Sequence, residues 1–275
     1  MSDASLQNDK VLCLADTLLE KLLTWCQAPS ARANSSVLSF VKFRSFNRAV
    51  TQYRSFLQLL KEGQWEDALV LARGLYELDL NLSEISCSSD PEGAAKQFVK
   101  FGKFLLIRLE QKRLEDQLRD QRLQPQASAQ TIAECEGKLA AIASTLDNDF
   151  AKFRKPNGKW QDSWSGISVE TLAQHLATET GAQRGQNDYF VFRLASLFTH
   201  NTPGSLFLVL PQNRETADWS QFRVALDKAG REGLREFLYQ ASVCLVDIVG
   251  MAGDSIAGYE RLWFDEFALP LLQKF

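Results

Sequence analysis

The stretch VLSFVKFRSFNRAVTQYRSFLQLL, residues 37–60, decides the fold class. Its apolar side chains recur at alternating steps of three and four residues, namely at Phe43, Phe46, Val50, Tyr53, Leu57 and Leu60. Such spacing places them on one face of an α-helix. Similar spacing covers most of the chain, whereas strand-like alternation is nearly absent, and its best example is the short stretch SLFLVL at 205–210. The sequence therefore predicts an all-α protein, a multi-helix bundle.

Boundary signals divide the chain into helices. The first helix is predicted over about 6–27, where Ala-Pro-Ser at 28–30 stops it, and further helices over about 65–85 and 218–251. Asp90-Pro91-Glu92 opens another helix with a cap, a first-turn proline and an acidic residue. The Phe-rich tail within 255–275 is expected to dock on the bundle, because it would otherwise expose a large apolar patch. We expect a single all-helical domain over 1–275.

A charged hairpin is predicted over residues 100–153. The segment RLEQKRLEDQLRDQR at 108–122 mixes both charges so densely that most of its surface must be solvated, and Gln124-Pro125 then turns the chain into a helix ending near Phe153. This projecting arm serves either contacts with a protein partner or solubility. The loop at 154–166 follows, and its tryptophans either pack onto the core or line a pocket. A helix over about 168–180 comes next.

Composition narrows the functional classes. The chain has 275 residues and a net charge of −3, so no global field draws it onto nucleic acid or an anionic membrane, and any RNA contact must be local. No apolar stretch is long enough to span a membrane and no secretory leader is present, so we expect a cytoplasmic protein. The five cysteines are scattered and only two histidines occur, which predicts free thiols, no metal site and no cofactor.

Two strongly apolar helices each carry one polar stripe. In DYFVFRLASLFTH at 188–200, steps of four, three and four residues place Tyr189, Arg193, Ser196 and His200 within about 60° of one another. In ALVLARGLYELDLNLSE at 68–84, a second narrow line is formed by Arg73, Glu77 and Glu84. Helices this apolar are normally buried, so these polar side chains need partners or a water-filled cleft. Two stripes that face each other would meet that need.

Two interpretations of the stripes stay open. In the first, Glu77 bridges Arg73 and Arg193 in a buried ion-pair network, and His200 caps a helix end. In the second, the stripes line an anion-binding cleft in which Arg193 holds a phosphate and His200 transfers a proton. The other histidine, His175, lies on a mostly polar helix and is expected at the surface.

The segment from Arg193 to His200 resembles the R-x(4–6)-H signature of the HEPN (higher eukaryotes and prokaryotes nucleotide-binding) superfamily of helical bundles. The wider order also resembles a large, poorly characterised bacterial helical family over about residues 36–250. Its shared elements are an R-x-x-x-E helix, a Trp-containing loop and a Y-x-x-x-R-x-x-S-x-x-x-H helix. The residue after the arginine, commonly polar in active HEPN members, is Leu194 here.

The resemblance implies a metal-independent RNA endonuclease, or an inactive relative, of a bacterial defence or stress system such as toxin–antitoxin or phage defence. Arg193 and His200 would be catalytic, and Tyr189, Ser196, Arg73 and Glu77 would support or bind. The superfamily's sites usually form between two copies of the chain, so a homodimer and an RNA substrate are implied. The alternative is a non-enzymatic helical module that holds a protein partner through the arm or the Trp loop.

Overall fold

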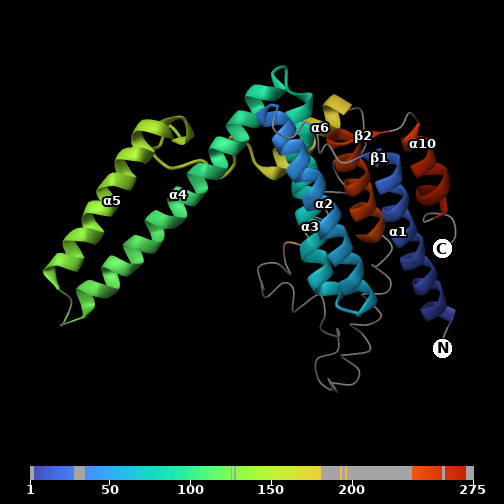
Figure 1. The fold of residues 1–275 in the computed structure, drawn as a ribbon, viewed down its shortest axis with the longest axis horizontal. Coiled ribbons are helices and arrows are strands. Elements are labelled where there is room, and N and C mark those ends of the chain that lie inside the picture. The colour runs from blue at the N-terminus through green and yellow to red at the C-terminus, as the bar shows by residue number, and fades with distance from the viewer. Residues whose placement is uncertain are drawn as a thin grey trace. The chain divides into compact units, whose positions relative to one another are not determined.

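The computed structural model describes residues 3–27, 35–124, 126, 128–180, 193, 196, 237–255 and 258–270. Helices dominate these ranges (Figure 1), and the prediction of an all-α multi-helix bundle is confirmed. The chain forms two compact units, with Met1–Pro91 and Val169–Phe275 in unit 1 and Glu92–Ser168 in unit 2. Compactness alone does not decide whether two units unfold together, so the single domain over 1–275 stays a prediction.

The centre of unit 1 is the helix pair α2 (Val37–Lys61) and α3 (Trp65–Cys87), which lie side by side in Figure 1. Helix α2 begins after Ser36, whose hydroxyl oxygen accepts a hydrogen bond from the backbone N–H of Ser39 at 3.0 Å. It ends at a tight turn in which Gly63 has a φ of 73°, a conformation that glycine adopts without steric cost. The periodic apolar face forms the core, with Tyr53, Phe56, Leu57, Leu69, Leu75, Leu82 and Ile85 fully buried.

A helix over residues 237–252 closes the core of unit 1 against this pair. The hydroxyls of Tyr53 and Ser242 are 2.6 Å apart, and Ser242 donates its hydrogen to the carbonyl of Leu238 at 2.6 Å. Tyr53 is therefore the donor in the first bond, and both buried hydroxyls are satisfied. On α3, Ser83 donates to the sulfur of Met251 at 3.6 Å. The predicted part of this helix over 218–236, and the strand candidate at 205–210, lie outside the described residues.

The two ends of unit 1 meet. Helix α1 (Asp3–Trp25) stops two residues earlier than predicted, because β1 (Cys26–Gln27) pairs antiparallel with β2 (Asp254–Ser255). Helix α10 (Tyr259–Trp263) and a π-helical turn (Phe264–Ala268) follow. The buried ring of Phe267 contacts Trp25 edge-to-face at 6.1 Å between centroids, and Glu266 forms an ion pair with Lys21. The described part of the Phe-rich tail thus packs on α1.

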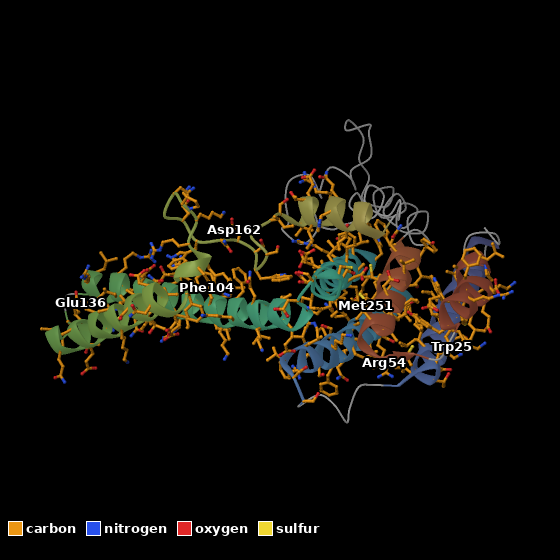
Figure 2. The ribbon with its side chains drawn as sticks, turned by 90° about the horizontal axis from the view of Figure 1, so that it is seen from above. Trp25, Arg54, Phe104, Glu136, Asp162 and Met251 are labelled. Atoms are coloured by element: carbon orange, nitrogen blue, oxygen red, sulfur yellow. The ribbon has the colours of Figure 1, made fainter. Side chains whose placement is uncertain are left out.

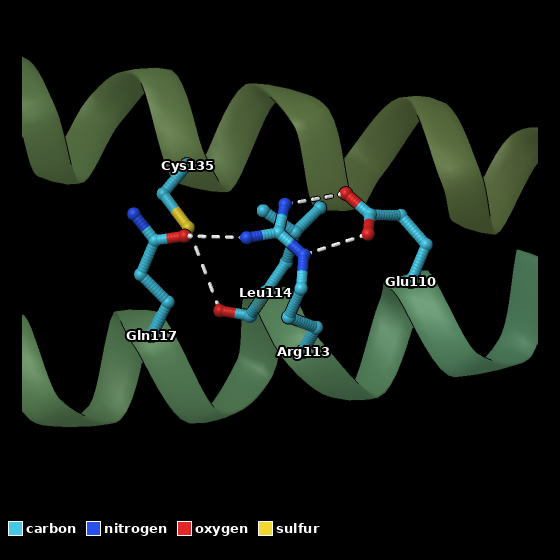
Figure 3. Close-up of polar contacts among 5 residues, drawn as sticks. All are labelled: Glu110, Arg113, Leu114, Gln117 and Cys135. Carbon is cyan, nitrogen blue, oxygen red and sulfur yellow. Dashed lines mark hydrogen bonds and ion pairs between the residues drawn. The ribbon is translucent and has the colours of Figure 1, made fainter.

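Unit 2 contains a helical hairpin of α4 (Pro91–Leu123) and α5 (Ala129–Asp149), as Figure 1 shows. Only a narrow seam is apolar, formed by Leu114, Leu118 and Cys135 together with Ile132, Leu139 and Ile142. Figure 3 shows two residues of this seam, where the Cys135 thiol donates to the carbonyl of Leu114 at 3.5 Å. Beside it, Arg113 binds both carboxylate oxygens of Glu110 and reaches Gln117 at 3.5 Å. The charged surface predicted for the arm is present.

An aromatic cluster fills the open end of this hairpin, near the labelled Phe104 in Figure 2. The helix predicted to reach Phe153 ends at Asp149, and a 3-10 turn (Ala151–Phe153) replaces its last residues, because Phe150 and Phe153 both turn inward and are buried. Phe104 lies at the centre, with ring centroids 6.0 Å from Phe150, 5.5 Å from Phe153 and 5.1 Å from Trp160. The cluster gives the hairpin a second core.

The Trp-rich loop packs down onto unit 2, which was one of its two predicted outcomes. Trp164 is buried against Phe98 at 5.7 Å between ring centroids, and its carbonyl accepts a hydrogen bond from Gln97 at 2.9 Å. Gly158 and Gly166 make the two sharp turns with φ near 80°. Helix α6 (Val169–Thr180) then returns the chain to unit 1 and packs against α3.

Candidate functional site

The polar stripe of α3 is present, and two of its residues, Arg73 and Glu77, form an ion pair with each other. The Arg73 guanidinium donates to Glu77 through Nε at 3.1 Å, and this ion pair joins positions four residues apart on one helix face. The side chain of Arg73 is 18% exposed and that of Glu77 is 40% exposed. The pair therefore lies at the boundary between core and solvent, where its carboxylate is open to water.

Further along the same stripe, Glu84 lies 3.5 Å from Nδ1 of His175 on α6. The His175 side chain is 53% exposed, as predicted for a surface histidine. Of the three groups predicted to share one line on α3, Glu84 thus lies where α3 meets its neighbour α6. At this end the stripe joins two helices.

The second stripe is described at two of its four positions. Arg193 and Ser196 are both helical, as predicted, with Arg193 exposed and Ser196 partly buried. A fully buried network would have required Arg193 to be enclosed, and its exposure is what an open anion site needs. Tyr189 and His200 lie outside the described residues. That the two stripes face each other, with Arg193 opposite Glu77, stays a prediction.

Metal ligands do not gather in the described ranges, where no group of three or more His, Cys, Asp or Glu side chains could hold an ion. All five cysteines are free thiols, with Cys26, Cys135 and Cys244 buried and Cys13 and Cys87 exposed. Across the same ranges, no helix is both long and apolar enough to cross a bilayer.

A second polar site lies in unit 2, and it was not predicted from the sequence. Cations surround the aromatic cluster of Phe104: the Lys100 ammonium lies 5.6 Å from the Phe150 ring and the Lys152 ammonium 4.9 Å from the Phe153 ring. The Arg154 guanidinium lies 4.2 Å from the ring of Trp160. The available signals were the spacing of lysines along 96–103 and the basic run at 152–159. Neither signal alone shows that the two segments meet.

Taken together, the fold and the two polar sites define an all-α protein with a polar helix stripe in unit 1 and a cationic aromatic cluster in unit 2. Residues 40–216 match a family described as "Family of unknown function (DUF5677)", and the chain belongs to that family. The matched range includes the Arg73–Glu77 helix, the Trp-rich loop and the segment from Tyr189 to His200. No curated protein and no solved structure shows a significant match to the chain.

Proposed function

We propose that this chain is a HEPN-like RNA endonuclease that works without a metal ion, with Arg193 and His200 as its catalytic pair. The observation that carries the proposal is the exposure of Arg193 on a helix whose remaining residues are largely apolar. An exposed guanidinium can meet an anion from solvent, whereas a buried one has to be paired within the protein. Its position seven residues before His200 fits the R-x(4–6)-H signature.

The proposed reaction is an internal transfer at phosphorus. The ribose 2′-oxygen attacks the adjacent phosphate, the 2′-O–P bond forms and the 5′-O–P bond breaks. His200 takes the 2′-hydroxyl proton or supplies one to the leaving 5′-oxygen, because an imidazole titrates near neutral pH. Arg193 stabilises the added negative charge through its planar fork of N–H donors. The products are a 2′,3′-cyclic phosphate and a 5′-hydroxyl, so the step needs no oxidant and no metal.

The remaining residues of the two stripes would support this pair. Ser196 lies one helical turn from Arg193 and is partly buried, so its hydroxyl suits the orientation of a bound phosphate. The Arg73–Glu77 pair is held at a partly exposed position and supplies a fixed dipole beside the proposed cleft. Tyr189 completes the stripe. A homodimer that brings two Arg–His pairs around one phosphate is part of the proposal.

The test is cleavage of a labelled structured RNA by the full chain in EDTA. The chain has only two histidines, so His175→Ala is a matched control for His200→Ala. Wild type and His175→Ala should cleave and leave a cyclic phosphate end. His200→Ala should lose roughly 10²–10⁴-fold in rate, as removal of a general acid or base does. Arg193→Ala should lose about 10²–10³-fold, as for one oxyanion donor. Cleavage that survives His200→Ala would refute the assignment.

The second candidate is a non-enzymatic helical interaction module or an inactive relative. One observation favours it: α4 exposes Leu105, Leu106 and Leu109 at 49%, 68% and 68%, and unpaired leucines on a helix suit a partner helix. Absence of cleavage on several RNAs would favour this candidate. Sedimentation of wild type beside Leu106→Gln/Leu109→Gln would then show whether the arm holds two copies together.

A further inference from the structure

The charge of unit 2 differs from that of the chain as a whole. Residues 92–168 contain 13 Lys and Arg against 10 Asp and Glu, whereas the whole chain carries a net charge of −3. Most of these cations have a carboxylate partner within unit 2: Lys112 pairs with Asp116, Arg154 with Asp147 and Lys155 with Asp162. In the described part of the chain, six of the thirteen cations have no such partner, and the excess of positive charge lies among them: Lys100, Lys103, Arg108, Lys138, Lys152 and Lys159.

Three of these six cations are lysines that stand next to phenylalanines of the aromatic cluster in the sequence. Among the described residues, Lys100, Lys103 and Lys152 form no ion pair. Lys100 and Lys103 lie three residues apart on α4, which separates them by about 4.5 Å along the helix axis. Lys152 joins them from the 3-10 turn after α5. We use the name cationic face for these three lysines.

The aromatic cluster fixes two of these ammonium groups near each other. Lys100 lies over the ring of Phe150 and Lys152 over the ring of Phe153, and these two rings are stacked with centroids 6.4 Å apart. Partial desolvation, followed by repulsion from Lys100, lowers the pKa of Lys152. Cation–π contacts can hold each lysine singly, but they leave the repulsion between the two charges in place. A bound anion would relieve it.

The surroundings favour a phosphate backbone over a protein partner. The rings beneath the cationic face, including Phe101, Phe104, Phe150 and Phe153, are all buried, so they offer no exposed aromatic anchor of the kind that protein interfaces use. Of the exposed leucines on α4, Leu109 lies about 180° round the helix from Lys100, whereas Leu106 lies about 60° from Lys103. Trp160, the partly exposed ring, is covered by Arg154, so stacking on a nucleobase is not available either.

We propose that the cationic face of unit 2 binds the phosphate backbone of single-stranded RNA without sequence preference. Two ammonium groups over neighbouring rings, neither of them in an ion pair with a described residue, form a seat for phosphate oxygens, and Lys103 extends it along α4. Lysine binds phosphate as a point charge, which requires no fixed base geometry. This binding site lies in unit 2 and does not depend on the catalytic pair proposed in unit 1.

The experiment measures binding of a labelled 20-nucleotide uridine strand to the full-length His200→Ala chain, by fluorescence anisotropy between 50 and 200 mM salt. Neutralisation of three phosphates predicts a slope of about −2 for log K against log salt, at roughly 0.7 per phosphate for single strands. Lys100→Gln/Lys152→Gln should weaken binding at least tenfold and reduce the slope to about −0.7. Lys103→Gln alone should reduce it to about −1.4.

The control is Lys61→Gln/Lys112→Gln, which removes the same total charge from two lysines that already have carboxylate partners. It should keep wild-type affinity and slope. The proposal is overturned if the control loses as much as the cationic-face variant, if wild type does not bind, or if polyglutamate of equal length competes as well as RNA. RNA binding without cleavage by wild type would uphold this site and refute the nuclease. Cleavage by wild type, together with lysine variants that bind RNA as tightly as their parent, would uphold the nuclease and refute this binding site.

Discussion

Gly250 is expected to be the glycine in the described part of unit 1 that least tolerates a side chain. It lies in the helix over 237–252, and a Cβ built there would overlap the phenol oxygen of Tyr259 and come within 2.6 Å of its ring carbon Cζ. Tyr259 is buried, so relief requires its ring or α10 to move against packed neighbours. Overpacking of this kind costs about 1–3 kcal/mol, and the better helix propensity of alanine returns about 0.5–1 kcal/mol. Gly250→Ala should therefore destabilise the chain by about 1–2 kcal/mol.

Gly102→Ala is the matched control, because Gly102 is also helical and a Cβ there would meet nothing within 4 Å. It should gain about 0.5–1 kcal/mol from helix propensity alone. Differential scanning calorimetry measures both, and at roughly 2–4 °C per kcal/mol Gly250→Ala should lower the Tm by about 2–8 °C. Because Gly250 belongs to unit 1 and Gly102 to unit 2, the same scans show whether the units melt together.

The reasoning would be refuted if Gly250→Ala were as stable as its parent, or gained stability as Gly102→Ala should. A double variant gives a further check. Tyr259→Phe removes the overlapping oxygen but leaves Cζ at 2.6 Å, so in the Gly250→Ala background it should restore only part of the lost stability.

Two further predictions concern buried side chains. Leu114→Ala should lower the free energy of unfolding by about 2–5 kcal/mol, because Leu114 lies in the narrow seam of the α4–α5 hairpin. Leu109 is 68% exposed, so Leu109→Ala should change that free energy by less than about 0.5 kcal/mol. Urea titrations measure both, and equal effects would contradict the seam. Burial, and then the Glu260 carboxylate, raise the pKa of Cys26 from 9.0 to about 11. The folded state therefore disfavours the thiolate, so stability should be constant below pH 9 and fall towards pH 11. Urea midpoints at pH 8 and 10.5 should differ less in Cys26→Ala than in wild type, and an equal loss would contradict the assignment.

The helices could be predicted because their boundaries rest on local chemistry. Pro91 opens α4 as predicted, and the caps Ser36 of α2 and Ser128 of α5, which were not predicted, are local signals of the same kind. Where the prediction was wrong, a distant segment decided the outcome. Helix α1 ends at Trp25 because residues 254–255 pair with β1, a contact between stretches far apart in the sequence.

In the candidate sites too, features set by neighbouring residues could be predicted and features set by distant segments could not. The Arg73–Glu77 pair follows from a spacing of four residues on a helix, so the sequence predicted it. Exposure of Arg193 could not be predicted, because periodicity gives the face of a helix and not what covers that face. The cationic face was missed since Lys100 and Lys152 come from segments that only the α4–α5 hairpin brings together.

The meeting of α1 with the Phe-rich tail has a consequence for synthesis on the ribosome. Trp25 and Lys21 emerge early, but their partners Phe267 and Glu266 are translated some 240 residues later. At roughly 5–20 residues per second, α1 must wait on the order of 10–50 s for them. The whole of unit 2 is complete long before that. Helix α1 also contacts α2, which is translated soon after it, so it is the Trp25 end of nascent α1 that waits uncovered for the tail and that a chaperone could hold.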